Sequence, residues 1–120
     1  MEMEKDVLEI KSPWTLVYIE YVDEFIAEIK AALPPDHELR DHEIVPGIKL
    51  SRRWVFIVDD DTTGEQILID FERKKRWKKT KFYAPTIMVF KSRDEVRERI
   101  NRDHQAELEK FKEEERRGNA

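Results

Sequence analysis

The stretch WVFIVDDDTTGEQILIDFE, residues 54–72, decides the fold because it holds two strand-like runs on either side of a hydrophilic turn. The runs 54–59 and 66–72 are rich in β-branched and aromatic residues, and the turn between them includes a glycine. If Asp59 pairs near Gln66, alternate side chains of each strand share one face of a hairpin. The face predicted to form the core consists of Trp54, Phe56, Val58, Ile67, Ile69 and Phe71.

The opposite face of this hairpin is also apolar, since it carries Val55, Ile57 and Leu68. A sheet with one face in solvent alternates apolar and polar residues instead. We therefore predict that the hairpin lies in the middle of its sheet, covered on both faces by helices, by other parts of the chain or by a partner.

Before the hairpin, the sequence predicts an amphipathic helix that begins at Ser12-Pro13 and ends at Pro34-Pro35. Serine can cap a helix, and proline suits its first position. An alternative assigns a strand to residues 15–19, but the helical phase continues from residue 20 without a break. Residues 1–11 are left unassigned. The helical stripe consists of Trp14, Tyr18, Val22, Phe25, Ile29 and Leu33.

Two further strands and a second helix complete the predicted elements. Residues 42–50 indicate a strand with a bulge, a bend or an edge position at Pro46-Gly47, and residues 84–90 indicate another strand. Ser92 and Glu95 form a capping box, so a helix should start at residue 93. Its narrow apolar stripe consists of Val96, Ile100, Leu108 and Phe111, with His104 in the same row.

These elements define an α+β fold: an N-terminal helix, a three- to four-stranded antiparallel meander and a long C-terminal helix. The 120 residues fit one domain, 1–120, with residues 1–11 and 112–120 loosely held. A helix that runs to residue 117 would be about 37 Å long, which exceeds the width of a domain of this size. Its last turns should therefore project.

Composition excludes several classes of function. The chain has no cysteine, which excludes disulfides, thiolate metal sites and thiol nucleophiles. No apolar run exceeds the five residues 54–58, and the run 16–19 is shorter still, so none is long enough for a membrane span; the first residues are acidic, unlike a signal peptide. We expect a cytoplasmic protein that does not bind membranes. Few amides and a 42% charged fraction resemble heat-adapted proteins.

A basic run with interleaved aromatic residues is the most conspicuous motif. Residues 52–91 hold 10 bases and 6 acids, whereas residues 1–51 hold 5 bases and 12 acids. Such a run is typical of nucleic-acid or polyanion binding, although a solvated loop with its rings turned inward is the commoner explanation. The candidate polyanion-binding residues are Arg73, Lys74, Lys75, Arg76, Trp77, Lys78, Lys79 and Lys81, followed by Phe82 and Tyr83.

One short motif suggests metal-dependent hydrolysis. Glu72-Arg73-Lys74 resembles the Glu-x-Lys step of the PD-(D/E)xK nucleases, in which a hairpin brings an aspartate beside that step to hold a divalent metal. Here the candidate aspartates, 59–61, lie at the turn, and Glu72 lies at the far end of the hairpin. The nuclease therefore remains a remote alternative.

The repeated triplets Asp36-His37-Glu38 and Asp41-His42-Glu43 contain residue types that bind zinc, nickel or iron. Their five-residue offset matches no metal motif, so a polar surface loop is the better interpretation, and no metal or cofactor is predicted.

The sequence contains no catalytic constellation, and we predict a non-enzymatic binding domain. Its partner would be another protein or a second copy, held by the sheet or by the C-terminal stripe of Val96, Ile100, Leu108 and Phe111. The alternative is nucleic-acid or polyanion binding by residues 73–81.

Overall fold

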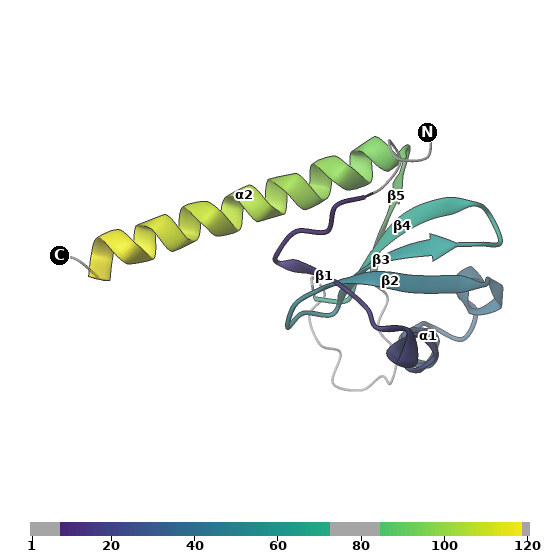
Figure 1. Ribbon diagram of the computed structural model, residues 1–120. Helices are drawn as coiled ribbons and strands as arrows, with labels where there is room; N and C mark the ends of the chain where they lie inside the picture. Colours follow the sequence, from purple (N-terminus) through teal and green to yellow (C-terminus); the bar gives the residue numbers. More distant parts are fainter. Residues whose placement is uncertain (1–7, 73–84, 119–120) are drawn as a thin grey trace.

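The computed structural model describes residues 8–72 and 85–118 and confirms the α+β class (Figure 1). The described strands form one antiparallel sheet in the order β1-β2-β3-β4-β5, a simple meander with five strands rather than three to four. The elements are β1 Trp14–Leu16, α1 Ile19–Ala32, the short 3-10 helix η2 Glu38–Asp41, β2 Ile44–Leu50, β3 Val55–Asp60, β4 Glu65–Asp70, β5 Thr86–Phe90 and α2 Arg93–Gly118.

The central hairpin has the predicted register, because Asp59 pairs with Gln66 between β3 and β4. Its turn contains Gly64 with a φ of 80°, a conformation that glycine adopts at little cost. β2 and β5 flank the hairpin on its two sides, which places it in the middle of the sheet as predicted.

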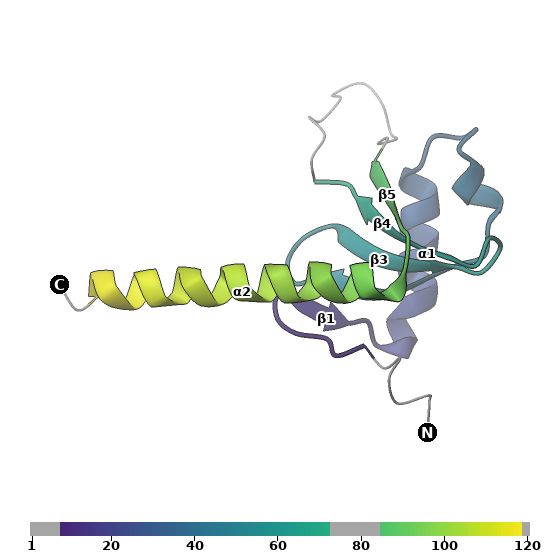
Figure 2. The same cartoon turned by 90° about the horizontal axis from the view of Figure 1, so that it is seen from above.

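Both faces of the hairpin are buried, as the two apolar faces predicted. On the α2 side, the buried cluster consists of Trp14, Ile48, Val55, Ile57, Leu68, Phe90, Val96 and Ile100. On the α1 side, it consists of Ile29, Leu33, Leu39, Ile44, Phe56, Val58, Ile67 and Ile69. α1 and α2 thus cover opposite faces of the sheet (Figure 2).

Trp54 is an exception to the predicted core. It lies just before β3 and is 46% exposed, although its ring contacts those of Phe25 and Phe56 at 6.2 and 6.0 Å between centroids. Phe71 is only partly buried against the same cluster. Alternation along the strand correctly predicted the sheet face on which Trp54 lies. It could not predict that the strand starts only after Trp54, which leaves this side chain partly exposed.

The predicted start of the first helix is wrong. Residues 14–16 form β1, paired antiparallel with β2 from Trp14 opposite Leu50 to Leu16 opposite Ile48, and α1 begins only at Ile19. Trp14 is buried against the sheet, and its indole Nε1 donates to Asp103 of α2 at 2.8 Å. These long-range contacts favour the strand over the local helical spacing.

The remaining predicted elements are confirmed with small changes. β2 has a register shift between Val45 and Ile48, the bulge expected at Pro46-Gly47, but β2 is not an edge strand. α2 starts at Arg93, and Ser92 Oγ accepts from the Glu95 amide at 3.3 Å. The Glu95 carboxylate completes the cap by accepting from the Lys91 amide at 2.8 Å.

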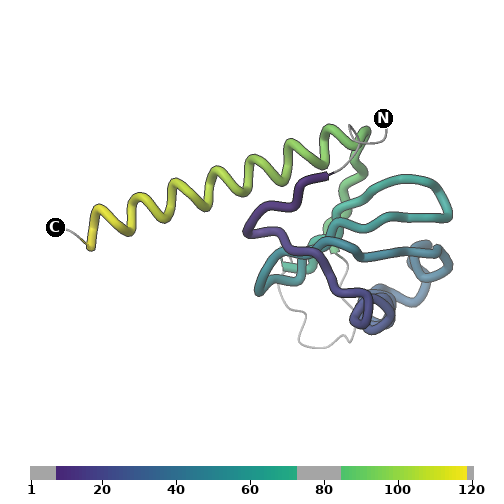
Figure 3. The backbone as a smooth tube through the Cα atoms, in the orientation of Figure 1, coloured from purple at the N-terminus to yellow at the C-terminus, as the bar shows by residue number. Residues whose placement is uncertain are grey.

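α2 is the longest element and only its first half belongs to the compact part of the molecule. It is joined to the fold at Asp103, which accepts from Trp14, and at His104, whose Nδ1 donates to the Ser12 carbonyl at 2.7 Å. The chain before β1 runs beside this half of the helix (Figure 3). Beyond it, α2 extends away from the sheet in both views of the ribbon. We call residues 105–118 the arm.

Candidate functional site

The four residues of the predicted C-terminal stripe divide into two pairs. Val96 and Ile100 are fully buried on the sheet, so they are part of this chain's own core. Leu108 and Phe111 lie on the arm and are 39% and 60% exposed. Phe111 follows Ile100 by eleven residues, about three helical turns, and so points to the side of α2 on which the sheet lies. The stripe therefore continues in solvent past the edge of the fold.

Charges of opposite sign flank this exposed stripe. At about 100° per residue, Glu107 and Glu114 lie along one side of Leu108 and Phe111. Lys112 and Arg116 lie along the other side. The arm therefore presents a narrow apolar ridge between an acidic flank and a basic flank.

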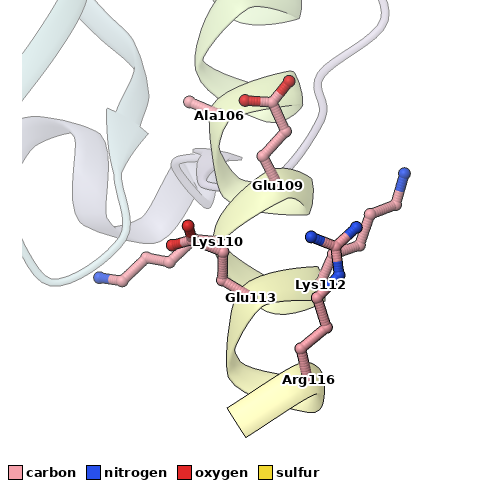
Figure 4. A pocket seen from close by; sticks show the side chains of 6 residues that line it. All are labelled: Ala106, Glu109, Lys110, Lys112, Glu113 and Arg116. Atoms are coloured by element: carbon pink, nitrogen blue, oxygen red, sulfur yellow. The ribbon is translucent and has the colours of Figure 1, made fainter.

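A shallow depression on the arm reaches from the face opposite Leu108 and Phe111 to the basic flank (Figure 4). All its side chains come from the single helix and most are charged, so it encloses nothing. They are Ala106, Glu109, Lys110, Lys112, Glu113 and Arg116. Because Ala106 and Lys110 lie away from the stripe, they are suitable positions for a control variant.

A second exposed apolar surface lies where β1 leads into α1. Leu16, Tyr18 and Ile19 are 66%, 71% and 87% exposed, and we call these three residues the edge patch. Soluble proteins seldom expose several large apolar side chains together unless they are bound. The sequence interpretation missed the patch by placing Tyr18 in a buried stripe. The available signal was the unbroken apolar run 16–19, which cannot all face the core side of one helix.

His42 and Asp60 form a largely buried polar pair. His42 Nδ1 donates to Asp60 at 2.7 Å, and Asp60 is 3% exposed. Burial raises the pKa of Asp60, but the hydrogen bond from His42 and those from the Thr62 and Thr63 amides together outweigh burial, and the pKa lies below its ordinary value. The pair ties the start of β2 to the β3–β4 turn.

The residues considered for metal binding do not converge. His42 binds Asp60, whereas His37 accepts from the Leu39 amide at 3.2 Å and caps η2. Asp59 pairs with Gln66, which lies four residues before Asp70 in β4. Asp59 and Asp70 are therefore separated by about 13 Å along the hairpin. Within residues 8–72 and 85–118, no group of three or more potential ligands is placed to hold a metal ion.

A cationic corner adjoins the end of the hairpin. Arg52 and Arg53 are exposed beside Trp54, whose amide donates to Glu72 at 3.3 Å. Lys49 Nζ lies 5.6 Å from the centre of the Trp54 ring; burial lowers the pKa of Lys49, and the charge of Glu72 opposes that shift. The predicted polyanion-binding residues 73–81, with Phe82 and Tyr83, lie outside the described residues.

Among the described residues, none of the helices has the length and apolar character needed to cross a bilayer. No protein-family model, curated protein or solved structure matches the chain.

Proposed function

We propose that the chain is a protein-interaction domain that self-associates through the arm of α2. The observation that supports this most strongly is the exposure of Leu108 and Phe111 on a helix that has already left its own fold. A helix in water has no need of apolar residues there, and an apolar ridge with charged flanks is the usual form of a helix that binds another protein surface.

The second copy is the partner to test first, because the experiment then needs only this chain. The test compares L108E/F111E with A106E/K110Q, which alters the opposite face of the arm. Both double variants lower the net charge by two, so charge alone cannot explain a difference. Sedimentation equilibrium over a concentration series measures the dissociation constant of each.

We expect the wild type and A106E/K110Q to dimerise with similar constants, and L108E/F111E to bind at least about tenfold more weakly. The proposal fails if the wild type remains a monomer at all concentrations, or if L108E/F111E dimerises as the wild type does.

A second candidate function, polyanion binding, is favoured by the corner at Arg52, Arg53 and Trp54. An indole exposed beside two arginines suits stacking and phosphate contact, and Glu72, to which Trp54 donates, is followed directly by the basic run 73–81. Titration with a single-stranded oligonucleotide should give an affinity that falls steeply with salt and is lost in K74Q/K75Q/K78Q/K79Q. Salt-insensitive binding, or none at low salt, would exclude this function.

A further inference from the structure

We propose that the arm of one copy docks on the edge patch of a second copy, and that a twofold axis makes the exchange reciprocal. The inference rests on the proposed self-association and names the surface that receives the arm. The ridge of the arm and the edge patch are both exposed apolar surfaces, with side chains that are 39% to 87% exposed.

The patch lies along the β1 edge of the sheet: Leu16 shares a sheet face with α2, whereas Tyr18 and Ile19 lead round that edge into α1, which covers the other face (Figure 2). Leu16 follows Trp14 by two residues in β1, so both side chains point to the same sheet face. Trp14 on that face donates to Asp103 of α2. Phe111 points to the sheet side of α2, so the arm of a twofold-related copy that runs along the β1 edge would turn the same apolar ridge toward the patch.

The charges around the two surfaces are complementary. Ile19 in the patch is accompanied by Glu20 and by Asp23 one helical turn later, and both acids are exposed. Lys112 and Arg116 form the basic flank of the arm. Docking with this flank over α1 joins opposite charges and points the acidic flank away from these acids, which selects one orientation.

Pairing two arms along their own stripes is less favourable in either orientation. In a parallel pair, Glu115, which continues the row of Leu108 and Phe111, meets its own copy. In an antiparallel pair, the flank of Glu107 and Glu114 meets the same acidic flank of the partner. The edge patch avoids both repulsions.

Reciprocal docking also doubles the buried area, which would be small for one arm on one patch. Stable interfaces bury about 1,200 Å² or more in total, and one short helix on a three-residue patch would be a weak contact. Twofold symmetry supplies the same contact twice, and the second forms within a complex that already exists.

The experiment is complementation between two variants that each lack one surface. Y18E/I19E alters the patch, and L108E/F111E alters the stripe. Each alone should bind itself at least about tenfold more weakly than the wild type. An equimolar mixture, with the two variants labelled by different fluorophores, should form mixed dimers more readily than either variant pairs with itself, although more weakly than the wild type, because only one of its two contacts joins an intact arm to an intact patch. M88E/V89E, on exposed apolar residues of β5 at the opposite sheet edge, is the matched control and should dimerise normally.

The outcomes separate this inference from the proposed function. A monomeric wild type overturns self-association itself. A dimeric wild type with an equally dimeric Y18E/I19E leaves self-association standing and overturns the patch as its docking site. If Y18E/I19E unfolds by circular dichroism, the charge swap replaces it: D23K and K112E should each weaken the dimer, and D23K/K112E should regain most of the loss. Additive weakening in the double variant overturns the inference.

Discussion

The two halves of α2 share one helical period but are held in different ways. The first half, residues 93–104, buries Val96 and Ile100 and fixes Asp103 between Trp14 and Arg99, at 2.8 and 2.9 Å. In the arm, every residue but Glu107 is exposed. Burial therefore stabilises the first half, whereas helix propensity and side-chain pairs a turn apart support the arm. The apolar stripe therefore continues into the arm, where burial in its own chain does not stabilise it. This is the feature that a function has to explain.

The largest expected effect is the difference between truncating the buried and the exposed stripe. I100A should lower the free energy of unfolding by about 2–4 kcal/mol, because it leaves a cavity beneath α2. L108A should change it by less than about 1 kcal/mol, since the side chain already contacts water. Urea unfolding at a concentration that keeps the protein monomeric measures both. Equal losses would mean that the arm is packed on the fold in solution.

The next largest effect concerns the polar pair of His42 and Asp60, and the measured quantity is again the free energy of unfolding. D60N should cost about 1–3 kcal/mol at neutral pH, because the charged acceptor of His42 and of two amides is removed. D59N, at an exposed position one residue earlier, should cost less than about 0.5 kcal/mol.

The pH dependence of the same variant follows from the lowered pKa of Asp60. A carboxylate whose pKa is lower in the folded state stabilises the fold fully above its unfolded value of about 3.9, and loses that contribution as the pH falls through the folded value. The gap between the wild type and D60N in urea unfolding should therefore be constant near neutrality and narrow below about pH 4. A gap that is unchanged in acid would contradict this assignment.

The sequence was sufficient for the parts of the fold in which local pattern and burial agree. The hairpin register, its two covered faces and the start of α2 were predicted from alternation, turn chemistry and capping, and the projection of its last turns from the length of the helix. The first helix was misplaced at its start because Trp14, Tyr18 and Val22 fit a helical row, while the contacts that fix Trp14 come from β2 and from Asp103, far away in the sequence.

The candidate surfaces show the same division. The stripe of α2 was visible from spacing alone, but spacing could not tell that Ile100 would be buried and Phe111 exposed, because the point at which the sheet ends depends on tertiary packing. The edge patch was missed for the same reason, since Tyr18 belongs to the helical row only if residues 14–16 are helical, and they form β1 instead.

The smallest effect is expected from removal of residues 107–118, which form most of the arm. A chain that ends at Ala106 keeps the contacts of Asp103 and His104, so its free energy of unfolding as a monomer should match that of the full chain within about 0.5 kcal/mol. At high concentration the two should separate, because dimerisation stabilises only the chain that can dimerise. The melting temperature of the full chain should rise with concentration, and that of the shortened chain should stay constant. If both melting temperatures rise equally, self-association does not use the arm; if the shortened monomer is much less stable, the arm belongs to the fold, and its exposed stripe needs no partner to explain it.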